Sequence, residues 1–127
     1  MAEGFANLYG KDVLIASSSG LAPVQMIARE TVECMREKEV DLSTHFPKRY
    51  DPYASAQLDV IINMSGFDLP QPTSAPVHTW MVRDPFGQSE QIYRESRDQI
   101  ERLVMQFILQ LRREARRGPE KTQAKPV

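Results

Sequence analysis

The sequence predicts an α/β fold in which a parallel sheet is flanked by helices. Two observations support this: short apolar runs that are typical of buried strands alternate with longer amphipathic helical patterns, and no internal repeat interrupts the alternation. Parallel strands are joined by right-handed crossovers. Because 127 residues fit one domain, we expect a single domain over residues 1–118.

Three segments are predicted to be strands. Asp12–Ser17 (DVLIAS) is a short apolar run that predicts a buried strand, and Leu58–Met64 (LDVIINM) predicts a second strand closed by Gly66. Pro76–Met81 is a weaker third candidate, since proline restricts it to an end position in a sheet.

Three segments are predicted to be helices. Met1–Tyr9 is a short helix expected to end at Gly10. A second helix is expected to begin at Pro23, a good first helical residue, and to run to about Lys38. The clearest helix follows Ser89, a suitable cap, and runs to about Arg113 with one mostly apolar stripe, formed by Tyr93, Ser96, Ile100, Leu103, Val104, Phe107 and Leu111.

The last residues, 119–127, are predicted to be a disordered basic tail. They hold too few apolar groups to offset the entropy lost on ordering. Such a tail is either a solvated end or a contact for an acidic partner.

Charge and composition exclude several classes of protein. Sixteen Lys and Arg against seventeen Asp and Glu give a net charge of -1, which argues against nucleic-acid or membrane-surface partners. No apolar run is long enough to span a membrane, and Glu3 stands where a secretory signal would carry a basic residue. The single cysteine, Cys34, excludes an intrachain disulfide. We expect a cytoplasmic protein.

Common catalytic templates and cofactor motifs are absent from the sequence, and we expect neither a metal ion nor a cofactor. His45 and His78 are far apart, and each is interpreted as a surface or hydrogen-bonded histidine. Cys34 lies within a helical pattern without a glycine turn that would activate it, and is interpreted as a structural thiol. Tyr50 and Tyr53 are either surface tyrosines, modification sites or the rim of a cleft.

Asp84 is the one candidate catalytic residue. It opens the turn Asp84-Pro85-Phe86-Gly87, directly after a predicted strand, at the sheet edge where open parallel sheets bind their ligands. A carboxyl group at this edge can act as a general acid. The same residues also form turns that have no chemical role, so both interpretations stay open at this point.

Several segments together resemble the low-molecular-weight protein tyrosine phosphatases, a family that includes the thioredoxin-type arsenate reductases. The resemblance covers about residues 1–112 and rests on these segments: MAEGFA at the start, Ser18-Ser19-Gly20-Leu21, Thr31 to His45 with Pro47-Lys48, Leu58 to Ser65, Asp84-Pro85, and Tyr93-Arg94 with Arg97 to Glu101. By this resemblance Asp84 protonates the departing tyrosyl oxygen. Ser18 is either a hydrogen-bonding residue near the phosphate loop or a plain turn residue.

The sequence departs from the family at its main catalytic motif. The family's first strand leads into a loop of Cys, five residues and Arg, whose thiolate attacks phosphorus. Six residues after Cys34 stands Val40, so no such motif exists in this sequence. Aligning Val13–Ala16 with that first strand puts Ser17 at the cysteine position, but it leaves Met1–Tyr9 unexplained, and we reject it. We therefore expect an N-terminally truncated chain, whose start was placed too late, with no residues that bind phosphate.

The resemblance implies a four-stranded parallel sheet of order 2-1-3-4, here lacking strand 1. The gap would lie between Asp12–Ser17 and Leu58–Met64. Three outcomes are open: an unstable chain, an inward shift of Asp12–Ser17 to pair with Leu58–Met64, or a second chain that fills the gap, for instance in a homodimer.

Three functions follow from the sequence. The first is a phosphatase that, in its complete form, hydrolyses phosphotyrosine or small phosphomonoesters through a phospho-cysteine, the present chain being inactive alone. The second is a non-catalytic interaction module derived from the phosphatase fold. The third is an arsenate reductase-like protein. The intramolecular disulfide route to arsenate reduction is disfavoured, because Ser65 stands at the first additional thiol position and no cysteine follows.

Overall fold

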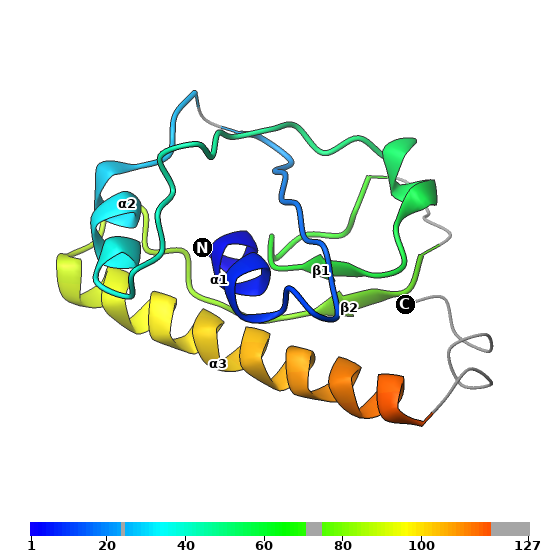
Figure 1. Ribbon diagram of the computed structural model, residues 1–127. Helices are drawn as coiled ribbons and strands as arrows, with labels where there is room; N and C mark the ends of the chain where they lie inside the picture. The colour runs from blue at the N-terminus through cyan, green and yellow to red at the C-terminus, as the bar shows by residue number, and fades with distance from the viewer. Residues whose placement is uncertain (24, 71–74, 118–127) are drawn as a thin grey trace.

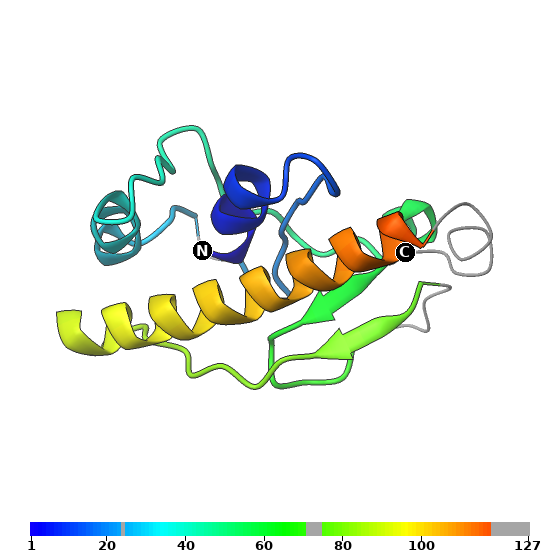
Figure 2. The ribbon, with the colours of Figure 1, turned by 60° about the horizontal axis from the view of Figure 1, so that its bottom comes forward.

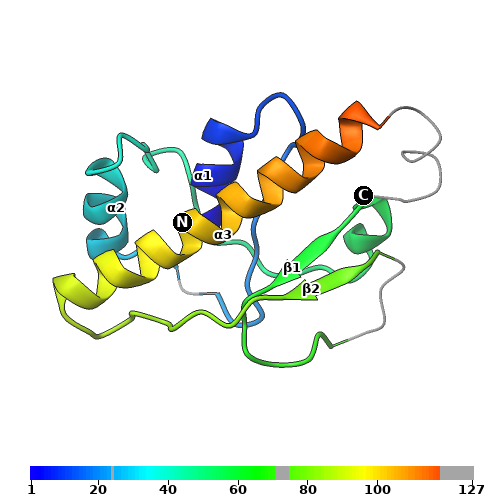
Figure 3. The same ribbon diagram turned by 90° about the horizontal axis from the view of Figure 1, so that it is seen from below.

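The computed structural model describes residues 1–23, 25–70 and 75–117. The helices are α1 (Ala2–Tyr9), α2 (Arg29–Arg36) and α3 (Glu90–Arg116), with a 3-10 turn at Ala54–Gln57. The strands are β1 (Ile61–Asn63) and β2 (Val77–Thr79), which pair in parallel with Ile62 opposite His78. Figure 1 shows α3 running beneath the other elements, and in Figures 2 and 3 α1 and the β1–β2 pair lie on opposite sides of it. The predicted α/β class with a parallel sheet is confirmed.

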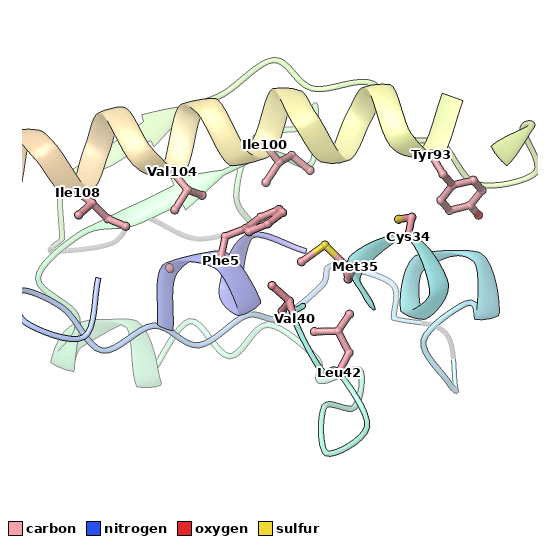
Figure 4. Packing of buried hydrophobic residues seen from close by; sticks show 10 residues of the cluster. Phe5, Cys34, Met35, Val40, Leu42, Tyr93, Ile100, Val104 and Ile108 are labelled. Atoms are coloured by element: carbon pink, nitrogen blue, oxygen red, sulfur yellow. The ribbon is translucent and has the colours of Figure 1, made fainter. Parts of the chain in front are cut away.

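The core forms where α1 and α2 pack on α3. Phe5, Met35 and Ile108 are completely buried and come from these three helices. Figure 4 shows Phe5 and Met35 facing the row formed by Ile100, Val104 and Ile108 on α3. Arg97 and Ile108 are buried members of this face that the predicted stripe of α3 did not include. Burial of one face of α3 therefore organises the domain.

The predictions for α1 and α3 are confirmed, and a local signal defines the start of α3. The Ser89 hydroxyl accepts a hydrogen bond from the Ile92 N–H at 3.3 Å and caps α3. Gly10 ends α1 with a negative φ of -112°, so its glycine is not required by a left-handed backbone. A Cβ at this position would instead lie 2.9 Å from the Ala6 oxygen and 3.0 Å from Ile108 Cδ1. Close approach to α3 explains this glycine.

The prediction of a strand at Asp12–Ser17 is wrong. Asp12 and Val13 lie in a turn, and residues 14–19 belong to no helix or strand. The side chain of Asn7 satisfies the backbone of this segment, since it donates to the Ala16 oxygen and accepts from the Ala16 N–H, both at 2.8 Å. The inward shift that would pair this segment with β1 does not occur either, and Ile15 is fully exposed.

The predicted start of the second helix is also wrong. α2 begins at Arg29 rather than at Pro23 and is therefore shorter than expected, although its end, at Arg36, lies close to the predicted one. Before the helix, Gly20 forms an isolated parallel bridge with Arg49, in which the Gly20 N–H bonds the Lys48 oxygen at 2.8 Å and the Tyr50 N–H bonds the Gly20 oxygen at 2.9 Å. The chain bends at residues 21 and 22, directly after this bridge, and again at residues 25 and 26, so no helix begins at Pro23. Helix propensity is a weak signal that tertiary context overrides, and the preference of Pro23 is not sufficient here.

The other two strand predictions hold in part. β1 and β2 lie inside Leu58–Met64 and Pro76–Met81 but have three residues each. A strand ends where its neighbour no longer provides hydrogen bonds, so the length of the apolar run overestimates the number of paired residues. The predicted tail, residues 119–127, lies outside the described residues.

Candidate functional site

Asp84 lies where the sequence predicted it, beyond the carboxyl end of β2 and before α3. Its Oδ1 accepts a hydrogen bond from the Phe86 N–H at 3.0 Å, and the Gln88 N–H bonds the Pro85 oxygen at 2.9 Å. Gly87 closes the turn with a φ of 75°, a left-handed conformation that favours glycine. Asp84 itself is exposed. Asp84 takes part in the turn through its Oδ1, but its side chain stays exposed, so a ligand can reach the carboxyl group from solvent.

Cys34 is not accessible to a ligand. It is 6% exposed, on α2, and its Sγ donates to the Thr31 oxygen at 3.5 Å. Burial raises the pKa of the thiol, although the positive charge of Arg97 opposes the rise. Figure 4 places the thiol beside Tyr93, at the end of the core. A thiol that is buried and protonated is a poor nucleophile.

A cluster of two arginines and a glutamate joins α2 to α3. The Arg97 guanidinium is buried and donates to the Cys34 carbonyl oxygen at 2.8 Å and to Glu37 Oε1 at 2.6 Å. Arg94 donates to both carboxylate oxygens of the same Glu37, with Nη2 at 2.9 Å from Oε2. Hydrogen bonds from Arg94 and Arg97 hold the pKa of Glu37 at about 2. Sequence reasoning gave this cluster no role, because the partners are distant in sequence.

A second charged cluster surrounds Glu3 in the first turn of α1. Glu3 Oε1 accepts from the Ser18 hydroxyl at 2.8 Å and lies 3.7 Å from Lys48 Nζ, while Oε2 lies 3.2 Å from His45 Nδ1. Burial opposes ionisation of Glu3, but the Ser18 hydrogen bond and the two basic groups outweigh it, so its pKa is lowered. Ser18 therefore has a defined partner, and His45, interpreted from the sequence as a surface or hydrogen-bonded histidine, lies beside the carboxylate of Glu3.

The remaining candidate residues do not converge on a site. His78 packs edge-on against Phe107, with ring centroids 6.3 Å apart. Tyr53 is 80% exposed, whereas the Tyr50 hydroxyl is buried without a hydrogen-bond partner in the described part of the chain. Among residues 1–23, 25–70 and 75–117, no three His, Cys, Asp or Glu side chains are placed to hold a metal ion. No helix in the same part of the chain has the length and apolar character needed to cross a bilayer.

We expect the Cys34 thiol of the native protein to react slowly with iodoacetamide. Burial limits access of the reagent and disfavours the thiolate. Alkylation followed by intact mass should proceed at least about a hundredfold faster in denaturant than in buffer. Equal rates would show that the thiol is accessible and would reopen a nucleophilic role for Cys34.

The Glu37 cluster predicts a specific loss of stability in acid. Because the pKa of Glu37 is lower in the folded state than its ordinary value of 4.5, its contribution is complete above that value and is lost as the pH falls towards 2. Glu37→Gln should flatten the dependence of the free energy of unfolding on pH in this window, measured by urea titration. Glu30→Gln, on the same helix but outside the cluster, is the control and should keep the wild-type slope.

Comparison with known proteins places the fold in a family. The chain matches the low molecular weight phosphotyrosine protein phosphatase family over residues 1–117. A glutaredoxin arsenate reductase of Synechocystis sp. is 27% identical over 115 residues, which are 87% of this chain and 87% of that protein.

Solved structures give the same result. An arsenate reductase in the phosphate binding state superposes with a TM-score of 0.79 at 26% identity, over 87% of this chain and 86% of that one. The arginine phosphatase YwlE, as a mutant with a phosphorylated active site serine, gives a TM-score of 0.75 at 22% identity, over 91% and 88% of the two chains, and shows the shared fold alone. The chain belongs to the low molecular weight phosphotyrosine protein phosphatase family.

Proposed function

We propose that this chain carries the general acid of a phosphomonoester hydrolase, with phosphotyrosine as the expected class of substrate, and that the attacking cysteine is not among these 127 residues. The observation that supports the proposal is the placement of Asp84. Its carboxyl group is exposed beyond the end of a parallel strand, on a turn fixed by its own hydrogen bond to Phe86. Family membership supports the class of reaction.

In the proposed reaction a cysteine thiolate attacks phosphorus, and the bond from phosphorus to the tyrosyl oxygen breaks. The carboxyl group of Asp84 gives its proton to that oxygen, so a neutral phenol leaves. The carboxylate then takes a proton from the water that attacks the phospho-cysteine, which releases phosphate and regenerates the thiolate. Cys34 takes no part in this scheme, since it is buried and Val40 stands six residues after it.

The test compares the chain alone with a fusion in which a relative's first strand and Cys-x5-Arg loop precede Met1. The fusion should hydrolyse p-nitrophenyl phosphate, and the chain alone should not. In the fusion, Asp84→Asn should lower kcat for a phosphotyrosine peptide by roughly 10²- to 10⁴-fold. The loss should be smaller with p-nitrophenyl phosphate, because nitrophenolate leaves more readily without a proton.

The chain offers a matched control for this substitution. Asp51 precedes Pro52, and its Oδ1 accepts from the Tyr53 N–H at 2.9 Å, as Asp84 Oδ1 accepts from Phe86. Asp51→Asn should therefore keep the activity of the fusion. Equal activity of the chain alone and the fusion would refute the claim that the attacking cysteine is absent from these 127 residues. An Asp84→Asn fusion with full activity would refute the role of Asp84 as the general acid.

Arsenate reduction is the second candidate, and the relatives named as arsenate reductases favour it. Reduction of arsenate to arsenite takes two electrons, which two thiols supply by forming a disulfide. Cys34 is the one cysteine here and is buried, so the thiols would have to come from outside this chain. If the fusion produces arsenite from arsenate and glutathione faster than it hydrolyses phosphotyrosine, this candidate replaces the first.

A partner at the sheet edge is also proposed. β1 has β2 on one side and no other strand in the described residues, and Leu58, just before it, is 45% exposed. A second copy that pairs along this edge would satisfy its free backbone groups. Light scattering should then give twice the mass of the chain at micromolar concentration, whereas a strict monomer with a cooperative melt excludes the homodimer. A folded chain that binds a specific protein but no anion would instead support the interaction module.

A further inference from the structure

The segment that carries Asp84 is bound along α3 by side chains of that helix. We call residues 81–87 the Asp84 segment; it leaves β2 and runs beside the first half of α3 (Figure 3). The Gln99 amide donates to the Met81 oxygen at 3.1 Å. The Ser96 hydroxyl donates to the Arg83 oxygen at 3.0 Å.

Both contacts come from one side of the helix. Ser96 and Gln99 are three residues apart, so they lie along one side of α3. They meet the Asp84 segment in reverse order: Gln99 holds Met81, and Ser96 holds Arg83, the residue directly before Asp84.

The contact nearest to Asp84 is shielded from water. Ser96 is 3% exposed, so water does not readily replace its hydrogen bond to the Arg83 oxygen. The predicted stripe of α3 treated Ser96 as a member of the core face alone.

We propose that Ser96 and Gln99 are positioning residues that hold Asp84 in one orientation by fixing the Asp84 segment to α3. The catalytic meaning of this inference rests on the proposed function. A general acid works only within hydrogen-bond reach of the leaving oxygen, and a misplacement of about 1 Å can cost roughly 100-fold in rate. Asp84 is exposed and lies in a turn, so its placement depends on these contacts from the helix.

The first experiment measures backbone order in the full chain by ¹⁵N relaxation. In the wild type, residues 83–87 should have order parameters near those of rigid backbone, about 0.85, and in Ser96→Ala they should fall below about 0.6. Gln99→Ala, which removes the bond to the Met81 oxygen, should loosen Met81 most. Slow amide exchange at Ile100 and Val104 verifies that both variants keep the folded core.

Two variants serve as matched controls. Ser65→Ala removes hydroxyl bonds to Asn63 and Phe67 in the loop after β1, and Gln110→Ala removes an α3 amide that donates to Glu114. Neither should change the order of residues 83–87. Unchanged order of the Asp84 segment in both Ser96→Ala and Gln99→Ala, with the core folded, would overturn the inference.

The second experiment uses the fusion with a Cys-x5-Arg loop. Ser96→Ala should lower kcat for phosphotyrosine by about tenfold or more with little change in KM, and it should cost nothing further in an Asp84→Asn background. Additive losses would mean that Ser96 does not act through Asp84, and would overturn its role. If the fusion has no activity, the proposed function fails, while the relaxation result still decides whether α3 orders the Asp84 segment.

Discussion

The structure depends on the burial of one face of α3. Phe5 of α1 and Met35 of α2 have no solvent exposure and belong to one buried cluster with Ile100, Val104 and Ile108 of α3. Removing apolar surface from water is the main favourable term in folding, and the 27-residue helix α3 supplies the face on which the buried residues of α1 and α2 pack. The two short strands add little burial of their own, since the residues of β2 are exposed.

Polar side chains of α3 also bind α1 and α2. Arg97 satisfies the Cys34 carbonyl near the end of α2, and Arg112 donates to the Tyr9 oxygen at 2.8 Å near the end of α1. The last carbonyl groups of a helix have no hydrogen-bond donor within it, so Arg97 and Arg112 supply donors that α2 and α1 lack. The pairing of Arg97 with Glu37 also compensates the burial of its charge, because a buried cation is stable only when it is paired.

The same helix connects the fold to the proposed chemistry. Ser96 and Gln99 bind the Asp84 segment, while the neighbouring Arg97 binds α2. The thiol of Cys34 lies within this packed region and is unavailable, whereas Asp84 lies at its surface and is available. This contrast separates a structural cysteine from a candidate acid, and it is the reason that the proposed reaction draws its nucleophile from outside the chain.

Much of the fold could be predicted from the sequence because the signals are local. Ser89 caps α3, and the turn at Asp84 follows from its own residues and Gly87. The family resemblance, which rested on several short segments in order, was confirmed over residues 1–117. The role of Asp84 stays a prediction, since nothing in the geometry alone distinguishes an acid from a turn residue.

What only the tertiary structure decided concerns partners that are distant in the sequence. Asp12–Ser17 has the composition of a strand, but a strand exists only where another strand pairs with it, and the Asn7 side chain took that place at Ala16. Pro23 is a good helix start, yet the chain bends after the bridge between Gly20 and Arg49, and α2 begins only at Arg29. Local signals were therefore sufficient for α1, α3 and the turn at Asp84, because a helix satisfies its own backbone. The start of α2, the strands, the Arg97 cluster and the contacts that hold Asp84 depend on residues that only the folded chain brings together.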